Sequence, residues 1–161
     1  MTAFQRSERM PHLSTISRSG TGLTASATLA VETPGEGFTD ITAPVSAFVE
    51  QAGAGHGVLF LYIRHTSASL VIQENADPDV QTDLRTALRS IAPEDAGWVH
   101  HLEGPDDMPA HVRTMLTGVS IHVPVIAGKL ALGTWQAIYV AEHRARPHRR
   151  EIVLAFIGAP K

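Results

Sequence analysis

Alternating apolar and polar residues predict extended strands near both ends of the chain. Over residues 23–31, every second residue is Leu, Ala or Val, and the residues between them are mostly Thr and Ser. A period of two is typical of a strand with one buried face. Three more strands are expected over residues 119–125, 129–143 (with a break at about Gly133) and 151–157. These strands follow one another directly, so antiparallel pairing is expected.

The middle of the chain carries the most apolar segment and the predicted helices. Residues 58–65 (VLFLYIRH) form a strongly predicted strand, because aromatic and branched residues are typical of sheets. A second extended segment follows at 69–73. One short helix is expected over about 43–52, and a longer one begins at Asp77 and Pro78, a typical N-cap and first position. A third helix opens near Asp107 and ends at Gly118.

This order of elements predicts a single α+β domain. A chain of 161 residues matches the usual size of one domain, and 43% hydrophobic with 18% charged residues is ordinary globular composition. We expect residues 1–14 to be a flexible N-terminal tail and 15–161 to form the domain. Because mixed strands and helices are followed by a run of strands, a doubly wound parallel sheet is not expected.

Composition excludes several function classes and points to histidine. The chain has no cysteine, so disulfides, thiolate nucleophiles and cysteine metal ligands are excluded. A net charge of −3 argues against a nucleic-acid partner, and no apolar run approaches the roughly 18 residues of a membrane span. The N-terminal residues lack an apolar signal segment, so a cytoplasmic protein is expected. Nine histidines remain as the unusual feature.

The histidines beside polar segments are candidate metal ligands. His65 ends the apolar strand, where it is either a core histidine bonded to backbone or a ligand. The pair at 100–101 precedes EGPDDMPAH, whose His111 lies in the first turn of a helix. A loop histidine and a helix histidine at this spacing can converge on a metal, while the aspartates between them suit helix capping. Three neutral imidazoles with water would make an open site of the catalytic type.

The segment GTWQAIYVAEHR and the residues after it are candidates for acid–base chemistry and anion binding. Alternation places Gln136 and Glu142 on one strand face, which is either an exposed polar face or part of a site where the two are paired. Residues 143–150 hold four arginines and two histidines, typical of a solvated loop or of a phosphate clamp. In the second case Glu142 would act as a general base or orient a ligand, and Arg144 and Arg150 would bind phosphate.

Three motifs in order give the chain a family resemblance. HTSASLVIQENADPDVQTDL is followed by HHLEGPDDMPAH and then by GKLALGTWQAIYVAEHR, and the resemblance covers about residues 20–158. On these residues the chain resembles the YjbQ-type family, catalogued as uncharacterised protein family 0047 and often labelled secondary thiamine-phosphate synthase. The resemblance implies a β-sandwich core of mainly antiparallel strands with two or three short helices. It also implies a homotrimer and a histidine-rich pocket that can hold a metal.

The resemblance also implies which residues are functional. The family's histidines fall on His65, His100 and His111; His101 is a departure, and which member of the 100–101 pair points inward stays open. On this basis the residues expected in catalysis are Glu142, Asp77, Ser67 and Gln136. Those expected to bind substrate or phosphate are Arg150, Thr134 and Asn75, together with Arg144, which the basic segment suggests.

The activity implied by the resemblance is a transfer that joins hydroxymethylpyrimidine diphosphate to a thiazole phosphate and releases pyrophosphate. Such a step needs charge stabilisation on the leaving group. Imidazoles suit zinc, nickel, copper and iron; we expect zinc at the histidines, with Mg²⁺ an alternative partner of a diphosphate. The other readings are a non-catalytic trimer that binds a metal or metabolite, and a metal-dependent hydrolase of small phosphorylated molecules.

Overall fold

The computed structural model describes residues 20–161, and the predicted tail over residues 1–14 lies outside that part. Within it the helices are α1 (Thr42–Gln51), α2 (Pro78–Ile91) and α3 (Asp107–Thr117). The strands are β1 (Leu23–Thr33), β2 (Gly37–Asp40), β3 (Ala54–Ile63), β4 (Ala68–Glu74), β5 (Ser120–Ile126), β6 (Lys129–Leu130), β7 (Gln136–Glu142) and β8 (His148–Pro160).

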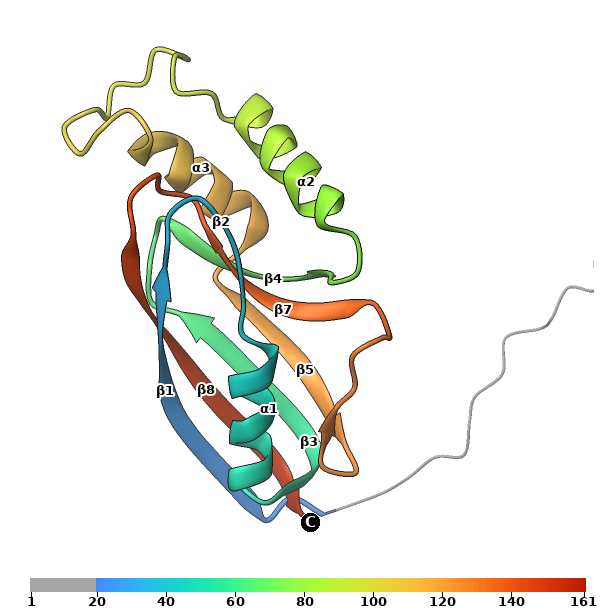
Figure 1. Ribbon diagram of the computed structural model, residues 1–161. Helices are drawn as coiled ribbons and strands as arrows, with labels where there is room; N and C mark the ends of the chain where they lie inside the picture. Colours follow the sequence, from blue (N-terminus) through green and yellow to red (C-terminus); the bar gives the residue numbers. More distant parts are fainter. Residues whose placement is uncertain (1–19) are drawn as a thin grey trace, which may run out of the picture.

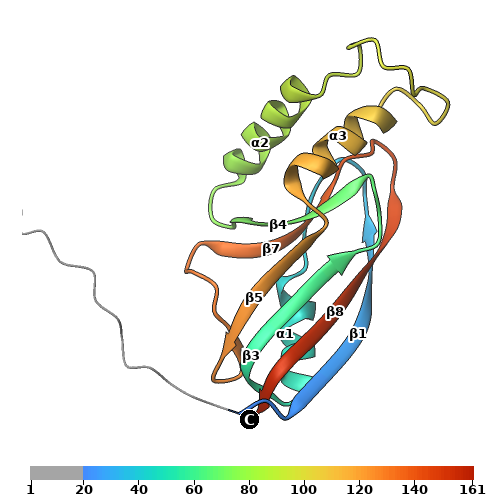
Figure 2. The same ribbon diagram turned by 180° about the vertical axis from the view of Figure 1, so that it is seen from behind.

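The strands form two antiparallel sheets, which confirms the predicted α+β class. The larger sheet has the order β1-β8-β3-β5-β6, and the smaller has the order β2-β7-β4. Helix α1 lies against one face of the larger sheet, and α2 and α3 lie together at the end of the molecule opposite the C terminus (Figures 1 and 2). Both views show β4 and β7 crossing beneath α3.

One core joins the two sheets and α1. Leu59 and Leu154 of the larger sheet, Leu70 and Ile138 of the smaller sheet, and Val45 of α1 belong to the same buried cluster. Each is at most 2% exposed. Burying a side chain of this size contributes roughly 1.5–3 kcal/mol, so this shared core holds the sheets face to face. The two-sheet core agrees with the expected sandwich.

The segment predicted as one long strand over residues 129–143 is two strands in different sheets. β6 pairs with β5 in the larger sheet, and β7 pairs with β2 and β4 in the smaller one. The break falls near Gly133 as predicted, where the amide of Gln136 donates to the carbonyl of Gly133 at 3.0 Å and closes a turn. This segment therefore carries the chain from one sheet to the other.

Helix α2 begins as predicted but packs differently. The Asp77 side chain accepts a hydrogen bond from the amide of Asp79 at 2.9 Å, with Pro78 in the first turn. None of the residues of α2 is buried, however, and Ile91 at its end is 58% exposed. Of the apolar residues that predicted the helix, Val80, Leu84 and Leu88 are half-buried, and only Ile91 is exposed.

Among the residues that the structure describes, none of the helices is both long and apolar enough to span a membrane.

Candidate metal centre

Three possible metal ligands converge at the start of α3. His100, in the loop before the helix, meets Asp107 and His111, which lie one helical turn apart on the same face. Their ligand atoms all lie within 4.8 Å of one another. Oδ2 of Asp107 is 2.7 Å from Nε2 of His100 and 3.4 Å from Nε2 of His111. The structure thus brings together two of the three predicted histidines.

The tautomer of His111 determines which of its ring nitrogens faces Asp107. Nδ1 of His111 lies 2.9 Å from the carbonyl oxygen of Thr66, which only accepts, so Nδ1 carries the proton. In the neutral ring, the lone pair of Nε2 then faces the Asp107 carboxylate. Two acceptors 3.4 Å apart repel each other unless a proton or a cation lies between them. The Thr66 carbonyl therefore leaves Nε2 ready to bind a metal.

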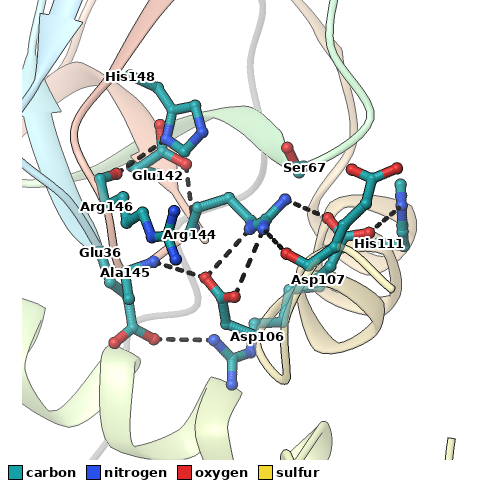
Figure 3. A network of polar contacts seen from close by, with 12 residues as sticks. Glu36, Ser67, Asp106, Asp107, His111, Glu142, Arg144, Ala145, Arg146 and His148 are labelled. Atoms are coloured by element: carbon teal, nitrogen blue, oxygen red, sulfur yellow. Dashed lines mark hydrogen bonds and ion pairs between the residues drawn. The ribbon is translucent and has the colours of Figure 1, made fainter. Parts of the chain in front are cut away.

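Asp107 is buried and held from behind by Arg144. The Asp107 carboxylate is 2% exposed, and its Oδ1 accepts a hydrogen bond from Nη1 of Arg144. The same guanidinium donates to Oδ2 of Asp106 at 3.1 Å and to the carbonyl of Glu103 at 2.8 Å. Figure 3 shows Arg144 reaching from the end of β7 to both aspartates. Arg144, predicted to bind phosphate, is instead committed to carboxylates.

Asp106 does not cap α3, in contrast to the capping interpretation. The N-terminus of α3 has no side-chain cap hydrogen bond, and Oδ2 of Asp106 accepts from the amide of Ala145 at 2.9 Å. Burial alone would raise the pKa of Asp106, but the Ala145 amide and the Arg144 guanidinium outweigh it and hold that pKa below its usual range. Through these bonds to Arg144 and Ala145, Asp106 and Asp107 connect the turn between β7 and β8 to the start of α3 and the loop before it.

His100 and His101 make different contacts. Nε2 of His100 points to the cluster, whereas Nδ1 of His101 bonds to the carbonyl of Val99 within its own loop at 2.7 Å. The structure therefore places His100, rather than His101, at the candidate centre.

His65 is placed apart from the cluster. Its Nε2 accepts the amide hydrogen of Glu151 at 3.1 Å, and its Nδ1 is 3.4 Å from a guanidinium nitrogen of Arg150. Burial, and then the charge of Arg150, lower the pKa of His65. Because the Nε2 lone pair is already used by the sheet backbone, this arrangement differs from the expected set of three histidine ligands. Asp107, rather than His65, is the third possible ligand of the cluster.

Glu142, at the end of β7, and Arg150, near the start of β8, form a buried ion pair. Nε and Nη2 of Arg150 donate to the two oxygens of Glu142 at 2.7 and 2.6 Å, and the two side chains are 5% and 0% exposed. Arg150 also donates to Oγ of Ser67 at 3.1 Å, and Thr33 donates to Glu142 at 2.7 Å. Burial would raise the pKa of Glu142, but the bonds from Arg150, the Arg144 amide and Thr33 outweigh it and lower that pKa. Glu142, Arg150 and Ser67, which were predicted to act on substrate, are thus at most 9% exposed, although Ser67 also lines a surface hollow.

The remaining predicted residues lie at the far end of the smaller sheet. In the register of β4 and β7, Ala68 pairs with Glu142 next to the centre, and Glu74 pairs with Gln136 at the other end. Six residue steps along a strand span about 20 Å. Four predicted residues lie at or just beyond that far end and are therefore distant from the centre: Asn75, Asp77, Thr134 and Gln136.

Two features of the centre were missed by sequence reasoning. Asp107 was interpreted as a helix cap, although its position four residues before His111 also places the two on one helix face. That spacing was the available signal. The Thr66 carbonyl had no signal, because a backbone oxygen carries no residue type.

Comparisons with known proteins agree on one family. The sequence model of the family described as "UPF0047 protein YjbQ-like" matches residues 27–159. The UPF0047 protein sll1880 of Synechocystis is 46% identical over 131 residues, which cover 81% of this chain and 89% of that protein. The UPF0047 protein YjbQ of Escherichia coli O157:H7 is 34% identical over 132 residues, covering 81% of this chain and 96% of its own length.

Solved structures show the same relationship. A conserved hypothetical protein of Thermus thermophilus matches with a TM-score of 0.71 and 38% identity, covering 79% of this chain and 97% of its own. A YjbQ/UPF0047 protein of Clostridium acetobutylicum matches with a TM-score of 0.72 and 33% identity, covering 82% and 98%. With a family match that spans most of the domain and relatives of this similarity, the chain belongs to the YjbQ-like UPF0047 family.

Proposed function

We propose that the chain is a metal-dependent enzyme acting on a small phosphorylated molecule, with His100, Asp107 and His111 as its metal ligands. The observation that carries the proposal is the 3.4 Å approach of the His111 lone pair to the Asp107 carboxylate. A divalent cation between these two acceptors would turn their repulsion into attraction.

The donor set favours a catalytic metal over a structural one. Two imidazole nitrogens and one carboxylate oxygen suit zinc and related metals, whereas Mg²⁺ prefers oxygen ligands and would belong with the phosphates of a substrate. Three protein ligands leave a coordination position open, as in catalytic zinc sites; structural sites are closed by four. His100 and His111 are also 42% and 34% exposed, so the open side faces solvent. This difference favours the enzyme over a non-catalytic binding protein.

The protein around the centre would hold the ligands and leave room for a substrate. Arg144 fixes the Asp107 carboxylate from behind, and Thr66 fixes the His111 ring. Thr66 also lines a hollow of about 440 Å³, together with residues 62, 64, 65 and 67. Since Arg144 and Arg150 are both paired with carboxylates, they are not free to bind phosphate. A bound metal would supply the Lewis-acid stabilisation that a departing phosphate oxygen requires.

The specific reaction proposed first is the one that the family resemblance implies. Hydroxymethylpyrimidine diphosphate and a thiazole phosphate would be joined with release of pyrophosphate. Hydrolysis of a small phosphorylated molecule is the second candidate, and the open coordination position favours it because water can bind there. A homotrimer is part of the proposal. Phe60, Tyr62 and Ile157 are 45–49% exposed on the larger sheet, and assembly would cover such residues.

Metal titration followed by an activity assay tests the proposal. Protein stripped of metal and desalted should bind one equivalent of zinc in calorimetry, and Asp107→Ala and His111→Ala should each weaken binding at least 100-fold. His101→Ala is the matched control and should bind as the parent does. Release of pyrophosphate from the substrate pair, or of phosphate from a panel of monophosphates, should then depend on added metal. Full zinc binding by both Asp107→Ala and His111→Ala would overturn the assignment.

A further inference from the structure

A second cavity, away from the metal centre, contains both lysines of the chain. It has a volume of about 510 Å³ and lies between α1 and the segment that begins with β6. Lys129 and Lys161 line it, and they are the only lysines in the sequence. The C terminus lies at the opposite end of the molecule from α3, whose first turn carries the metal centre (Figures 1 and 2). The cavity and the centre are therefore separate.

We propose that this cavity binds an organic phosphate monoester, with the phosphate between the two ammonium groups and the organic part against an apolar wall. Neither lysine forms an ion pair with any carboxylate of residues 20–161. Two unpaired like charges that share a cavity repel each other, and a dianion between them reverses the sign of that interaction. Glu50 also lines the cavity, so the phosphate would be held by the two ammonium groups themselves rather than by a net positive charge of the cavity.

Two polar side chains that line the cavity have hydrogen-bond donors that no described residue uses. Oγ1 of Thr42 accepts the amide hydrogen of Ile138 at 2.9 Å, which leaves its own proton for another acceptor. Oε1 of Gln136 accepts the amide hydrogen of Gly133 at 2.7 Å, so its NH₂ group is the part available for a ligand. Donors of this kind complement phosphate oxygens.

The apolar part of the lining indicates an organic ligand rather than a bare anion. Val49, Leu130 and Leu132 line the cavity together with the polar groups. Ligand sites that combine a largely apolar wall with a few polar groups bind molecules that have both parts. A ring or short alkyl group on the phosphate would cover this wall.

A strained hairpin brings the two lysines together. Ala127 and Gly128 connect β5 to β6, and both have positive φ, 49° and 76°. Ala127 is the one non-glycine residue with positive φ among those that the structure describes, and this conformation is costly for alanine. A Cβ on Gly128 would overlap Cε of Lys161, so the glycine lets that side chain lie across the turn. Positive φ at both residues is what a tight two-residue hairpin requires, so this turn places Lys129, at the start of β6, close to the Lys161 side chain that lies over Gly128.

Because the chain has only two lysines, nuclear magnetic resonance can observe the site directly. Reductive ¹³C-methylation keeps both positive charges and gives one signal per lysine beside that of the α-amino group. With metal-free, desalted full-length protein and 1-naphthyl phosphate as the probe, both lysine signals should shift saturably with one Kd. Calorimetry on the unmethylated protein should show the same binding. The measurement is made without metal, so its result is independent of the function proposed above.

Variants and two comparison ligands decide the chemistry. Lys129→Gln should weaken binding of 1-naphthyl phosphate at least tenfold, since one charge-assisted contact is lost. Arg149→Gln removes the same charge from an exposed ion pair on β8 and should stay within twofold of the parent. Inorganic phosphate and 1-naphthoate should both bind more weakly than the ester. The proposal is overturned if no saturable shift occurs, if Lys129→Gln binds as tightly as the parent, or if either comparison ligand binds as tightly as the ester.

Discussion

Replacing Arg144 with alanine should lower the free energy of unfolding by about 2–4 kcal/mol. The substitution leaves the carboxylate of Asp107 buried, at 2% exposure, with no cation against its Oδ1. Removing one partner of a buried ion pair typically costs about 3–5 kcal/mol, because the remaining charge is uncompensated. Arg144 itself is 14% exposed, so water can replace part of its role, and the expected loss is therefore smaller, at about 2–4 kcal/mol.

The shape of the guanidinium group should matter as well as its charge. Arg144 donates at once to Asp106, to Asp107 and to the carbonyl of Glu103. An ammonium group is a point charge that cannot span two carboxylates in this way. Arg144→Lys should therefore recover only about half of the loss, or roughly 1–2 kcal/mol.

Urea unfolding followed by circular dichroism measures both effects, and Arg146→Ala is the matched control. Arg146 lies two residues further along the same turn, is exposed, and has no side-chain hydrogen bond to the described residues. Its replacement should change stability by less than about 0.5 kcal/mol. For a chain of this size, the loss in Arg144→Ala corresponds to a fall in Tm of roughly 5–15 °C. A loss no larger than that of the control would refute the role assigned to the Asp107 pair.

Two further predictions concern buried ionisable groups. Arg150→Ala should cost about 3–5 kcal/mol in urea unfolding, and combining Arg150→Met with Glu142→Leu should recover most of it, since no buried charge then remains unpaired; a double variant as unstable as the single one contradicts this. Burial, and then the charge of Arg113, lower the pKa of His143 from 6.5 to about 4. The unfolded chain therefore binds the extra proton, and stability should fall by roughly 3 kcal/mol as pH drops from 6.5 to 4. His143→Gln should flatten that slope; an unchanged slope would show that other groups cause it.

Local patterns predicted most of the elements but not how they associate. Alternation identified the strand that became β1, aromatic and branched residues identified the one that became β3, and an N-cap residue with proline identified the start of α2. The four residues of β2 (Gly37–Asp40) are too few to show a period, and their extended form depends on pairing with β7. Likewise, nothing in residues 129–143 indicates that its two halves join different sheets, because pairing partners are distant in sequence.

The candidate site was predictable where one helix determines it. His111 and the loop histidines were identified from their position around the start of α3. The positions of His65, Glu142 and Arg150 depend instead on contacts between β3, β7 and β8. Their partners include a backbone amide that the sequence does not mark. Residue type alone therefore could not distinguish a functional site from a buried hydrogen-bond network for these three side chains.

The position of β8 in the larger sheet has a consequence for synthesis. This strand comes last in the chain but lies between β1 and β3, pairing with both over most of its length. On the ribosome, β1 cannot join the sheet until β8 has been translated, since β1 and β3 have no direct contact to form beforehand. Their apolar faces stay exposed for the several seconds that translation takes. Exposed apolar faces of this kind are what chaperones bind, and a stop codon before β8 would leave β1 without a neighbour in the sheet.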